Sequence, residues 1–240
     1  EELTRKEALV AETFFLPAPN NLAYPENVNL LQTANPRNPA AARSLRAESD
    51  WFLNQLGIAE EYDDVSGDLE RALEIYQQLF DTSEIRQYRG IALSRVANVH
   101  MNRGDWQQGL DLNRRMLQEF GDIRDLNGGH LGLIARLQIV VCLEQLQRSQ
   151  VAADSLLAFH RNVLRESDSI SRRQYADFIE RVDSQVERVA GQLQGDEAHI
   201  FRTEFDELRA RTQKKRSRKF FVGLLNRKLT DLIVERKRYN

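Results

Sequence analysis

The sequence predicts an all-α protein whose short helices pack in antiparallel pairs. Apolar residues recur at helical spacing nearly everywhere after residue 39. All five prolines lie within the first 40 residues, so residues 41–240 contain none that would interrupt a helix. No segment shows the sustained alternation of apolar and polar residues that is typical of strands. The predicted architecture is an α-solenoid of stacked helix pairs with a helical C-terminal extension.

Residues 1–38 are predicted to form a separate N-terminal segment. LTRKEALVAETFF (3–15) has the pattern of a short helix, and the proline-rich stretch that follows is expected to be extended through about residue 38. The prolines of this stretch are Pro17, Pro19, Pro25 and Pro36. Asn38-Pro39 then fits a helix start, because asparagine caps helix N-termini and proline is tolerated at the first helical position.

Six helices are expected between residues 39 and 164. The first begins at Pro39 and is broken by DDVSGD (63–68), and Leu69 to Leu79 mark the second. The other four are predicted over 91–101, 106–120, 131–146 and 152–164. The apolar faces of the first three helices are Leu45, Phe52, Leu56 and Ala59; Leu69, Ala72, Leu73, Tyr76 and Leu79; and Leu93, Val96, Ala97 and His100. Asn127-Gly128-Gly129 is interpreted as a loop.

The turn Gly104-Asp105-Trp106 separates the third and fourth predicted helices. We expect Gly104 to end the third helix in a left-handed conformation, which glycine adopts without strain. Asp105 is expected to accept hydrogen bonds from the first amides of the next helix, and Trp106 to cover the core at the turn. Gly67-Asp68 repeats the same device.

A small residue recurs early in the second helix of each predicted pair. Ala72, Gly109 and Ala152 take this position, and they are separated by 37 and 43 residues. Two helices cross closely only where a side chain at the contact is small, and an isolated helical hairpin cannot bury its apolar face. Hairpins that recur at this spacing are typical of helical solenoids.

The segment IALSRVANVHMNRGDWQQGLDLNRRML (91–117) resembles the tetratricopeptide-repeat (TPR) family. Leu93, Ala97 and His100 match the large, small and aromatic positions of its first helix, and Gly109 matches the small position of its second. The spacing exceeds the 34 residues of the family, and the proline that ends each repeat is missing. Asn113 also stands where the family has an aromatic residue.

This resemblance covers roughly residues 40–165, and we assign residues 39–168 to TPR-like helical repeats. It implies a superhelix with a concave surface that binds a protein or peptide, acting as a scaffold rather than as an enzyme. The inner faces of the first helices are expected to make the contacts, and they nominate four partner-binding residues. These are Arg95, Asn98, Asn102 and Arg136.

The layout of helical entry, proline-rich stretch, degenerate repeats and helical exit is similar to extracytoplasmic sensor regions of bacterial membrane histidine kinases. The chain starts with Glu-Glu and shows no signal peptide, and no apolar run has the length of a membrane span. We therefore expect a sensor or scaffold segment cut from a larger signalling protein, with an extracytoplasmic position favoured over a cytoplasmic one.

Catalytic, metal and cofactor sites are not predicted. The sequence contains no phosphate-binding, dinucleotide-binding, zinc-protease or hydrolase motif, and no two of its four histidines stand at i, i+4. His100 and His160 are interpreted as packing residues, and Cys142 as a buried apolar residue. The carboxylates of Glu60-Glu61 and Asp63-Asp64 are expected to solvate a turn, without the apolar setting that raises a carboxyl pKa.

Residues 169–240 are predicted to form a helical hairpin followed by a basic amphipathic helix. Apolar residues between 179 and 193 follow alternating spacings of three and four, which is the seam of a coiled coil. The seam consists of Ile179, Val182, Val186, Val189 and Leu193. Its expected partner is helix 198–213, through Phe201, Phe205 and Leu208, with the turn at Gly195-Asp196; a homodimer through 179–193 is the alternative.

Charge is distributed unevenly along the chain. Residues 202–240 carry a net charge of +8 and the whole chain carries −2, so residues 1–201 carry −10. Basic residues concentrate in QKKRSRKFF (213–221), at Lys214, Lys215, Arg216, Arg218 and Lys219. The alternative function is therefore an adaptor or regulator that docks on an anionic membrane surface or on nucleic acid through this cluster. Nucleic acid is less favoured because the run is short, the pI is about 6.2 and no recognition motif accompanies it.

Overall fold

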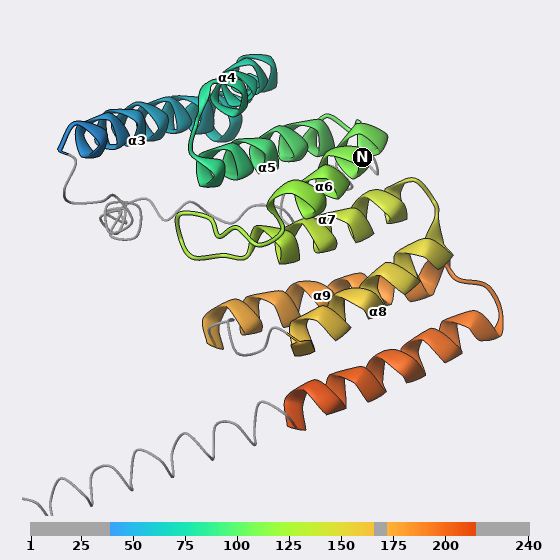
Figure 1. Ribbon diagram of the computed structural model, residues 1–240. Coiled ribbons are helices and arrows are strands. Elements are labelled where there is room, and N and C mark those ends of the chain that lie inside the picture. Colours follow the sequence, from blue (N-terminus) through green and yellow to red (C-terminus); the bar gives the residue numbers. More distant parts are fainter. Residues whose placement is uncertain (1–38, 166–171, 215–240) are drawn as a thin grey trace, which may run out of the picture. The chain divides into compact units, whose positions relative to one another are not determined.

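The computed structural model describes residues 39–165 and 172–214, and these residues are helical apart from short connections (Figure 1). The named helices are α3 (Pro39–Glu60), the π-helical turn η1 (Glu61–Ser66), α4 (Leu69–Thr82), α5 (Arg86–Asn102), α6 (Trp106–Phe120), α7 (Leu131–Gln145), α8 (Ser149–Arg165) and α9 (Arg172–Gln192). A further helix covers residues 196–214. The described ranges contain no strand, only an isolated bridge between Arg124 and His130. The predicted all-α class is confirmed. The predicted N-terminal helix, the proline-rich stretch and the basic amphipathic helix beyond residue 214 lie outside the described residues.

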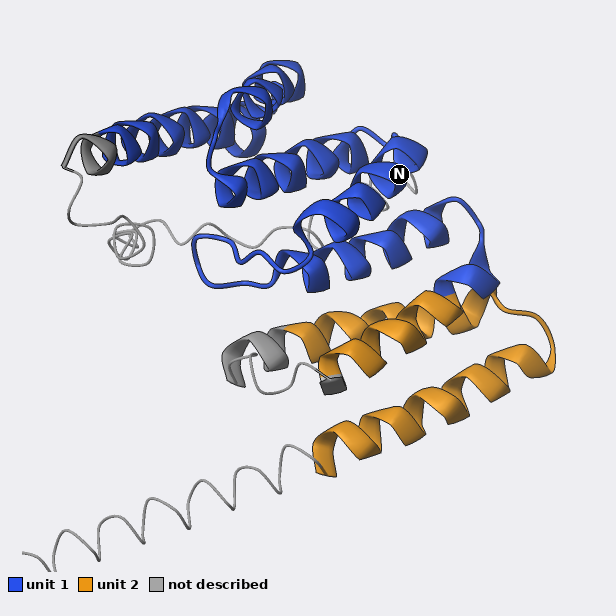
Figure 2. Ribbon diagram, viewed as in Figure 1, with its two compact units in different colours: residues 1–152 blue, residues 153–240 orange. Residues whose placement is uncertain are grey.

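The chain divides into two compact units, Glu1–Ala152 and Ala153–Asn240 (Figure 2). The division falls inside α8, whereas the sequence pattern placed the end of the repeats at residue 168. A long helix that continues through the division gives no sequence signal for it, because the apolar spacing does not change there.

In unit 1, consecutive helices pack on one another from α3 to α7, and α5 also contacts α7 directly. The connections from α4 to α5 and from α5 to α6 are three residues each, so these neighbours run antiparallel (Figure 1). α5 and α7, the first helices of two successive predicted pairs, are therefore in direct contact within unit 1.

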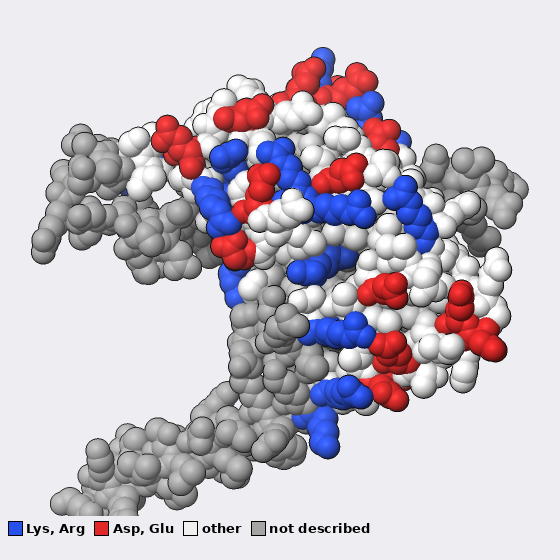
Figure 3. Space-filling model, turned by 45° about the vertical axis from the view of Figure 1, so that its right-hand side comes forward, with Lys and Arg blue, Asp and Glu red and all other residues white. Residues whose placement is uncertain are grey.

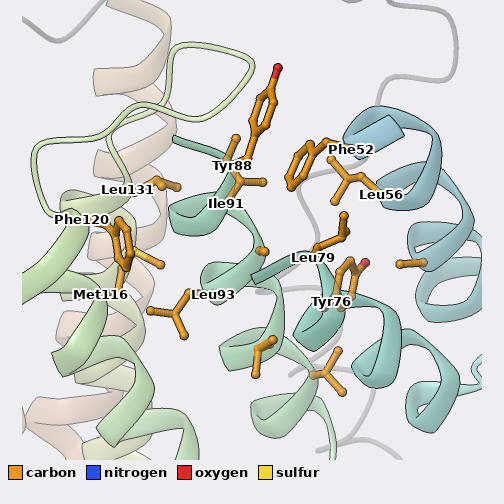
Figure 4. Close-up of a cluster of buried hydrophobic side chains, with 14 of the residues drawn as sticks. Phe52, Leu56, Tyr76, Leu79, Tyr88, Ile91, Leu93, Met116, Phe120 and Leu131 are labelled. Atoms are coloured by element: carbon orange, nitrogen blue, oxygen red, sulfur yellow. The ribbon is translucent and has the colours of Figure 1, made fainter. Parts of the chain in front are cut away.

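The core of unit 1 joins α3, α4 and α5 through large aromatic residues (Figure 4). Phe52 of α3 stacks on Tyr88 of α5 with ring centroids 4.1 Å apart and planes 8° from parallel. The Tyr88 hydroxyl lies 2.6 Å from Ser49 Oγ, and Tyr76 of α4 is fully buried in the same cluster. Burying aromatic side chains of this size supplies much of the stability of such a stack.

The recurring small residues lie at close helix contacts. Ala72 and Ala152 are fully buried. A Cβ atom at Gly109 would lie 2.6 Å from Met101 Cγ on α5 and 3.5 Å from Cys142 Sγ on α7. The prediction that α6 needs a small residue here is confirmed, since one position of α6 touches both neighbouring helices.

The two glycine turns adopt the predicted left-handed backbone, with φ of 81° at Gly104 and 68° at Gly67. Asp68 caps α4, because its Oδ1 accepts a hydrogen bond of 3.2 Å from the Arg71 amide. The prediction that Asp105 caps α6 is wrong. Its carboxylate turns back toward α5 instead, where Oδ2 lies 3.3 Å from His100 Nδ1 and 3.8 Å from Arg103 Nε.

Two predicted helix boundaries are also corrected. The acidic run after Glu60 does not break the helix at Asp63, because η1 continues it as a π-helical turn as far as Ser66. α5 begins at Arg86, five residues before the predicted start at Ile91. Its first turn is capped from a distant helix, since Glu48 Oε1 accepts hydrogen bonds from the Glu84 and Ile85 amides at 2.9 and 3.1 Å.

In unit 2, α9 packs against the helix over 196–214 as an antiparallel hairpin. The seam residues Val182, Val186 and Val189 are buried, as are Phe201, Phe205 and Leu208. Two ion pairs connect the helices: Arg202 to Glu187 and Arg209 to Asp183, each 3.0 Å long. Gly195 forms the turn with φ of 54°. The predicted hairpin is confirmed, and a homodimer through 179–193 stays a prediction.

Candidate functional site

Polar side chains from α3, η1, α5 and α7 meet along one face of unit 1. Three of the nominated residues, Arg95, Asn98 and Asn102, share one side of α5 because they stand three and four positions apart. Each contacts a polar residue on another element. We name this set the polar face; it comprises Glu60, Asp63, Asp64, Arg95, Asn98, Asn102 and Gln138.

The Arg95 guanidinium connects α5 to the end of α3. Its Nη2 lies 2.5 Å from Glu60 Oε1, and the side chains of Arg95 and Glu60 are 38% and 18% exposed. Burial opposes the charge of Arg95, but Glu60 and the neighbouring acidic oxygens raise its pKa above the ordinary value. The guanidinium therefore stays charged and is held in place on the polar face.

Amide side chains connect α5 to α7. Gln138 Nε2 donates a hydrogen bond to Asn98 Oδ1, and Gln138 is only 6% exposed. Gln138 Oε1 is buried without a hydrogen-bond partner among the described residues. This oxygen can therefore still accept a hydrogen bond.

Asp63 lies where η1 meets α5, and its carboxylate accepts a hydrogen bond from Asn102. Burial and the neighbouring Asp64 raise the pKa of Asp63 to about 6, against the opposing effects of Arg95 and Asn102. Burial also raises the pKa of Asp64. The expectation that these carboxylates lack a setting that raises a pKa is wrong for Asp63, which is partly buried on the polar face. Glu61 and Asp64 are exposed, in line with the expectation that they solvate the turn.

The fourth nominated residue, Arg136, does not lie on this face. It stands two residues before Gln138 on α7, which places it about 160° away around the helix. Of the basic cluster, Lys214 is described and exposed, whereas Lys215, Arg216, Arg218 and Lys219 lie outside the described residues.

Glu60, Asp63 and Gln138 belong to the polar face but are not among the residues that the sequence pattern nominates. Gln138 left a signal, as an uncharged polar residue at the middle of the apolar helix LGLIARLQIVVCLEQ. Glu60 and Asp63 left none, since their partners come from α5, about 35 residues further along the chain.

The other candidate groups have packing roles. His160 is 1% exposed, and its ring lies 4.4 Å from that of Phe205, so the packing interpretation is confirmed. Cys142 is fully buried as predicted, and burial raises the pKa of its thiol to about 12.

An open hollow of about 620 Å³ lies at the α5–α6 turn, beside His100 and Trp106.

Over residues 39–165 and 172–214, no group of three or more His, Cys, Asp or Glu side chains is arranged to hold a metal ion. Within the same ranges no helix is both long and apolar enough to cross a membrane.

Lys and Arg side chains alternate with Asp and Glu over the surface shown in Figure 3. The described part of that surface therefore presents mixed charge rather than one extended basic patch.

Comparison with known proteins adds no relative to this description. No protein-family model, curated protein or solved structure matches the chain.

Proposed function

We propose that unit 1 is a non-enzymatic, TPR-like α-solenoid that binds a protein or peptide segment along the polar face. The observation that carries this proposal is the direct contact between α5 and α7, because it aligns the first helices of two successive pairs. In stacked helix pairs, the first helices together form one extended surface. The chain would then act as a scaffold or sensor segment of a larger signalling protein.

The chemistry of the face fits an extended peptide. Asn98, Asn102 and Gln138 each carry an amide that both donates and accepts hydrogen bonds, as the backbone of a peptide does. Hydrogen bonds to neighbouring helices already hold these side chains, so little side-chain entropy would be lost on binding. Asn102 is exposed at the edge of the face and is well placed for first contact.

Selection of peptides from a random library on the immobilised 240-residue chain tests this function. Asn102→Ala is expected to weaken binding of the selected peptides about tenfold, the loss of one well-formed hydrogen bond or about 1.4 kcal/mol. Gln118→Ala is the matched control, because Gln118 is an exposed amide on the second helix α6. Equal effects of the two substitutions, or no selected peptide at all, would contradict the proposal.

The alternative function, docking on an anionic surface, is supported by the +8 charge of residues 202–240. Its test is binding to vesicles that contain phosphatidylserine, measured as a function of salt concentration. Replacing both Lys214 and Lys215 by glutamate is expected to abolish this binding. Unchanged binding by that variant would exclude the basic cluster as the contact.

A further inference from the structure

We propose that the end of the polar face formed by η1 and α5 is a recognition site for a cationic side chain, arginine or lysine, of a peptide ligand. This inference rests on the proposed function and specifies which ligands the face selects. The site consists of the carboxylates of Glu60, Asp63 and Asp64 close to Arg95, with the buried hydroxyl of Tyr76 nearby.

The carboxylates around Arg95 carry an excess of negative charge. Arg95 forms its ion pair with Glu60, which leaves the carboxylates of Asp63 and Asp64 without a cation of their own. Arg95 is the one cation among the described residues that lowers the pKa of either aspartate. Three carboxylates therefore share a single guanidinium, and a second cation would restore local neutrality.

The hydroxyl of Tyr76 is a buried polar group close to these carboxylates. This side chain is 0% exposed, and its hydroxyl has no hydrogen-bond partner among the described residues. It lies close enough to Arg95, Glu60 and Asp63 for each of them to affect its pKa, so the hydroxyl is a near neighbour of the carboxylate cluster. A buried polar atom without a partner costs free energy, and an N–H group of a ligand would supply the missing donor.

The partial burial of Asp63 would strengthen its contact with a cation of the ligand. Asp63 is partly buried, and charges in this setting interact more strongly than a pair on the open surface. Burial and the surrounding carboxylates raise the pKa of Asp63 to about 6 in the absence of a ligand. A bound cation would lower this pKa, so binding of the cation and binding of a proton compete.

A dependence on pH follows from this competition. The groups that face Asp63 are Glu60 and Asp64 on its own segment, Arg95 and Asn102 on α5, and Tyr76 on α4. Asp125 in the loop before α7 also interacts with Arg95, and burial raises its pKa as well. Affinity for a cationic peptide is expected to fall about tenfold between pH 7 and pH 5, as Asp63 becomes protonated.

A pair of matched peptides tests the site. Fluorescently labelled tetra-arginine and tetra-citrulline have the same shape, but the second has no charge. Fluorescence anisotropy with the full chain at pH 7 is expected to show binding of tetra-arginine at least tenfold tighter than binding of tetra-citrulline. Asp63→Asn should weaken tetra-arginine at least fivefold and remove the loss of affinity at pH 5.

Glu61→Gln is the control variant, because Glu61 is an exposed carboxylate in the same π-helical turn and the change in charge is identical. Its effect is expected to be less than twofold. Equal effects of Asp63→Asn and Glu61→Gln, or equal affinities for the two peptides, would overturn the inference. Thermal melting of both variants shows whether each is folded.

The outcome separates this inference from the proposed function. If library peptides bind through Asn102 but carry no arginine or lysine, the peptide-binding function holds and the cation site is wrong. If no library peptide depends on Asn102, the proposed function itself fails.

Discussion

Replacing Gly109 by alanine tests whether close helix contact is what holds the pairs of unit 1 together. The new Cβ atom would lie 2.6 Å from Met101 Cγ, more than 1 Å inside normal van der Waals contact. Helix propensity favours alanine over glycine by about 1 kcal/mol, but overpacking of this kind costs about 1–3 kcal/mol. The difference is a net loss of up to about 2 kcal/mol in the free energy of unfolding.

Gly57→Ala is the matched control, since Gly57 lies on an exposed side of α3 with nothing within 4 Å of the added atom. Only the propensity term acts there, so a gain of about 0.5–1 kcal/mol is expected. Urea unfolding followed by circular dichroism at 222 nm measures both variants.

A double-mutant cycle separates the contact from general effects of the substitution. In a Met101→Ala background the side chain that obstructs the new Cβ is gone, so Gly109→Ala should cost less than it does in the native chain. Two results would show that close contact at Gly109 does not limit stability. Gly109→Ala could be as stable as Gly57→Ala, or the stability lost through Gly109→Ala could be the same in the Met101→Ala background.

Three further predictions concern charged groups. Burial and Arg209 lower the pKa of His160 to about 4 from an ordinary 6.5, so the unfolded chain binds more protons between these values. The stability of unit 2 should therefore fall by up to about 3 kcal/mol as the pH drops from 6.5 to 4, and His160→Leu should flatten this dependence in thermal melts. Asp63 behaves in the opposite sense: its pKa is raised, so its contribution to stability decreases as the pH rises from about 4 to 6. Asp63→Asn should raise the melting temperature at pH 7, and a lower value would contradict the placement of this carboxylate in a buried cluster. Asp68→Ala removes a helix cap and should cost about 1 kcal/mol, whereas Asp105→Ala should cost less because Asp105 caps nothing; equal losses on urea unfolding would contradict this difference.

The sequence predicts most helices of this chain because their apolar spacing is regular. α6 begins at Trp106 and ends at Phe120 as predicted, and α7 begins at Leu131. The start of α5 was missed because its cap, the Glu48 carboxylate, comes from α3, about 36 residues earlier in the chain. A tertiary contact of this kind leaves no local pattern.

The candidate site shows the same limit. Spacings of three and four place Arg95, Asn98 and Asn102 on one side of α5, and each contacts a polar residue of another element. Arg136 lies on a different side of α7 from Gln138, and its part in binding stays a prediction; because α7 is buried on most sides, its apolar pattern does not mark which side meets the polar face. The role of Asp63 depends on a π-helical turn, and neither the spacing nor the composition of EYDDVS indicates one.

The central claim is that a peptide ligand lies along the polar face of unit 1. A nitroxide-labelled peptide selected on this chain tests it through paramagnetic broadening of side-chain amide signals in the NMR spectrum. We predict that the signals of Asn98, Asn102 and Gln138 broaden while that of Gln118 on α6 stays sharp. Broadening of Gln118 with the other three unaffected would contradict the claim.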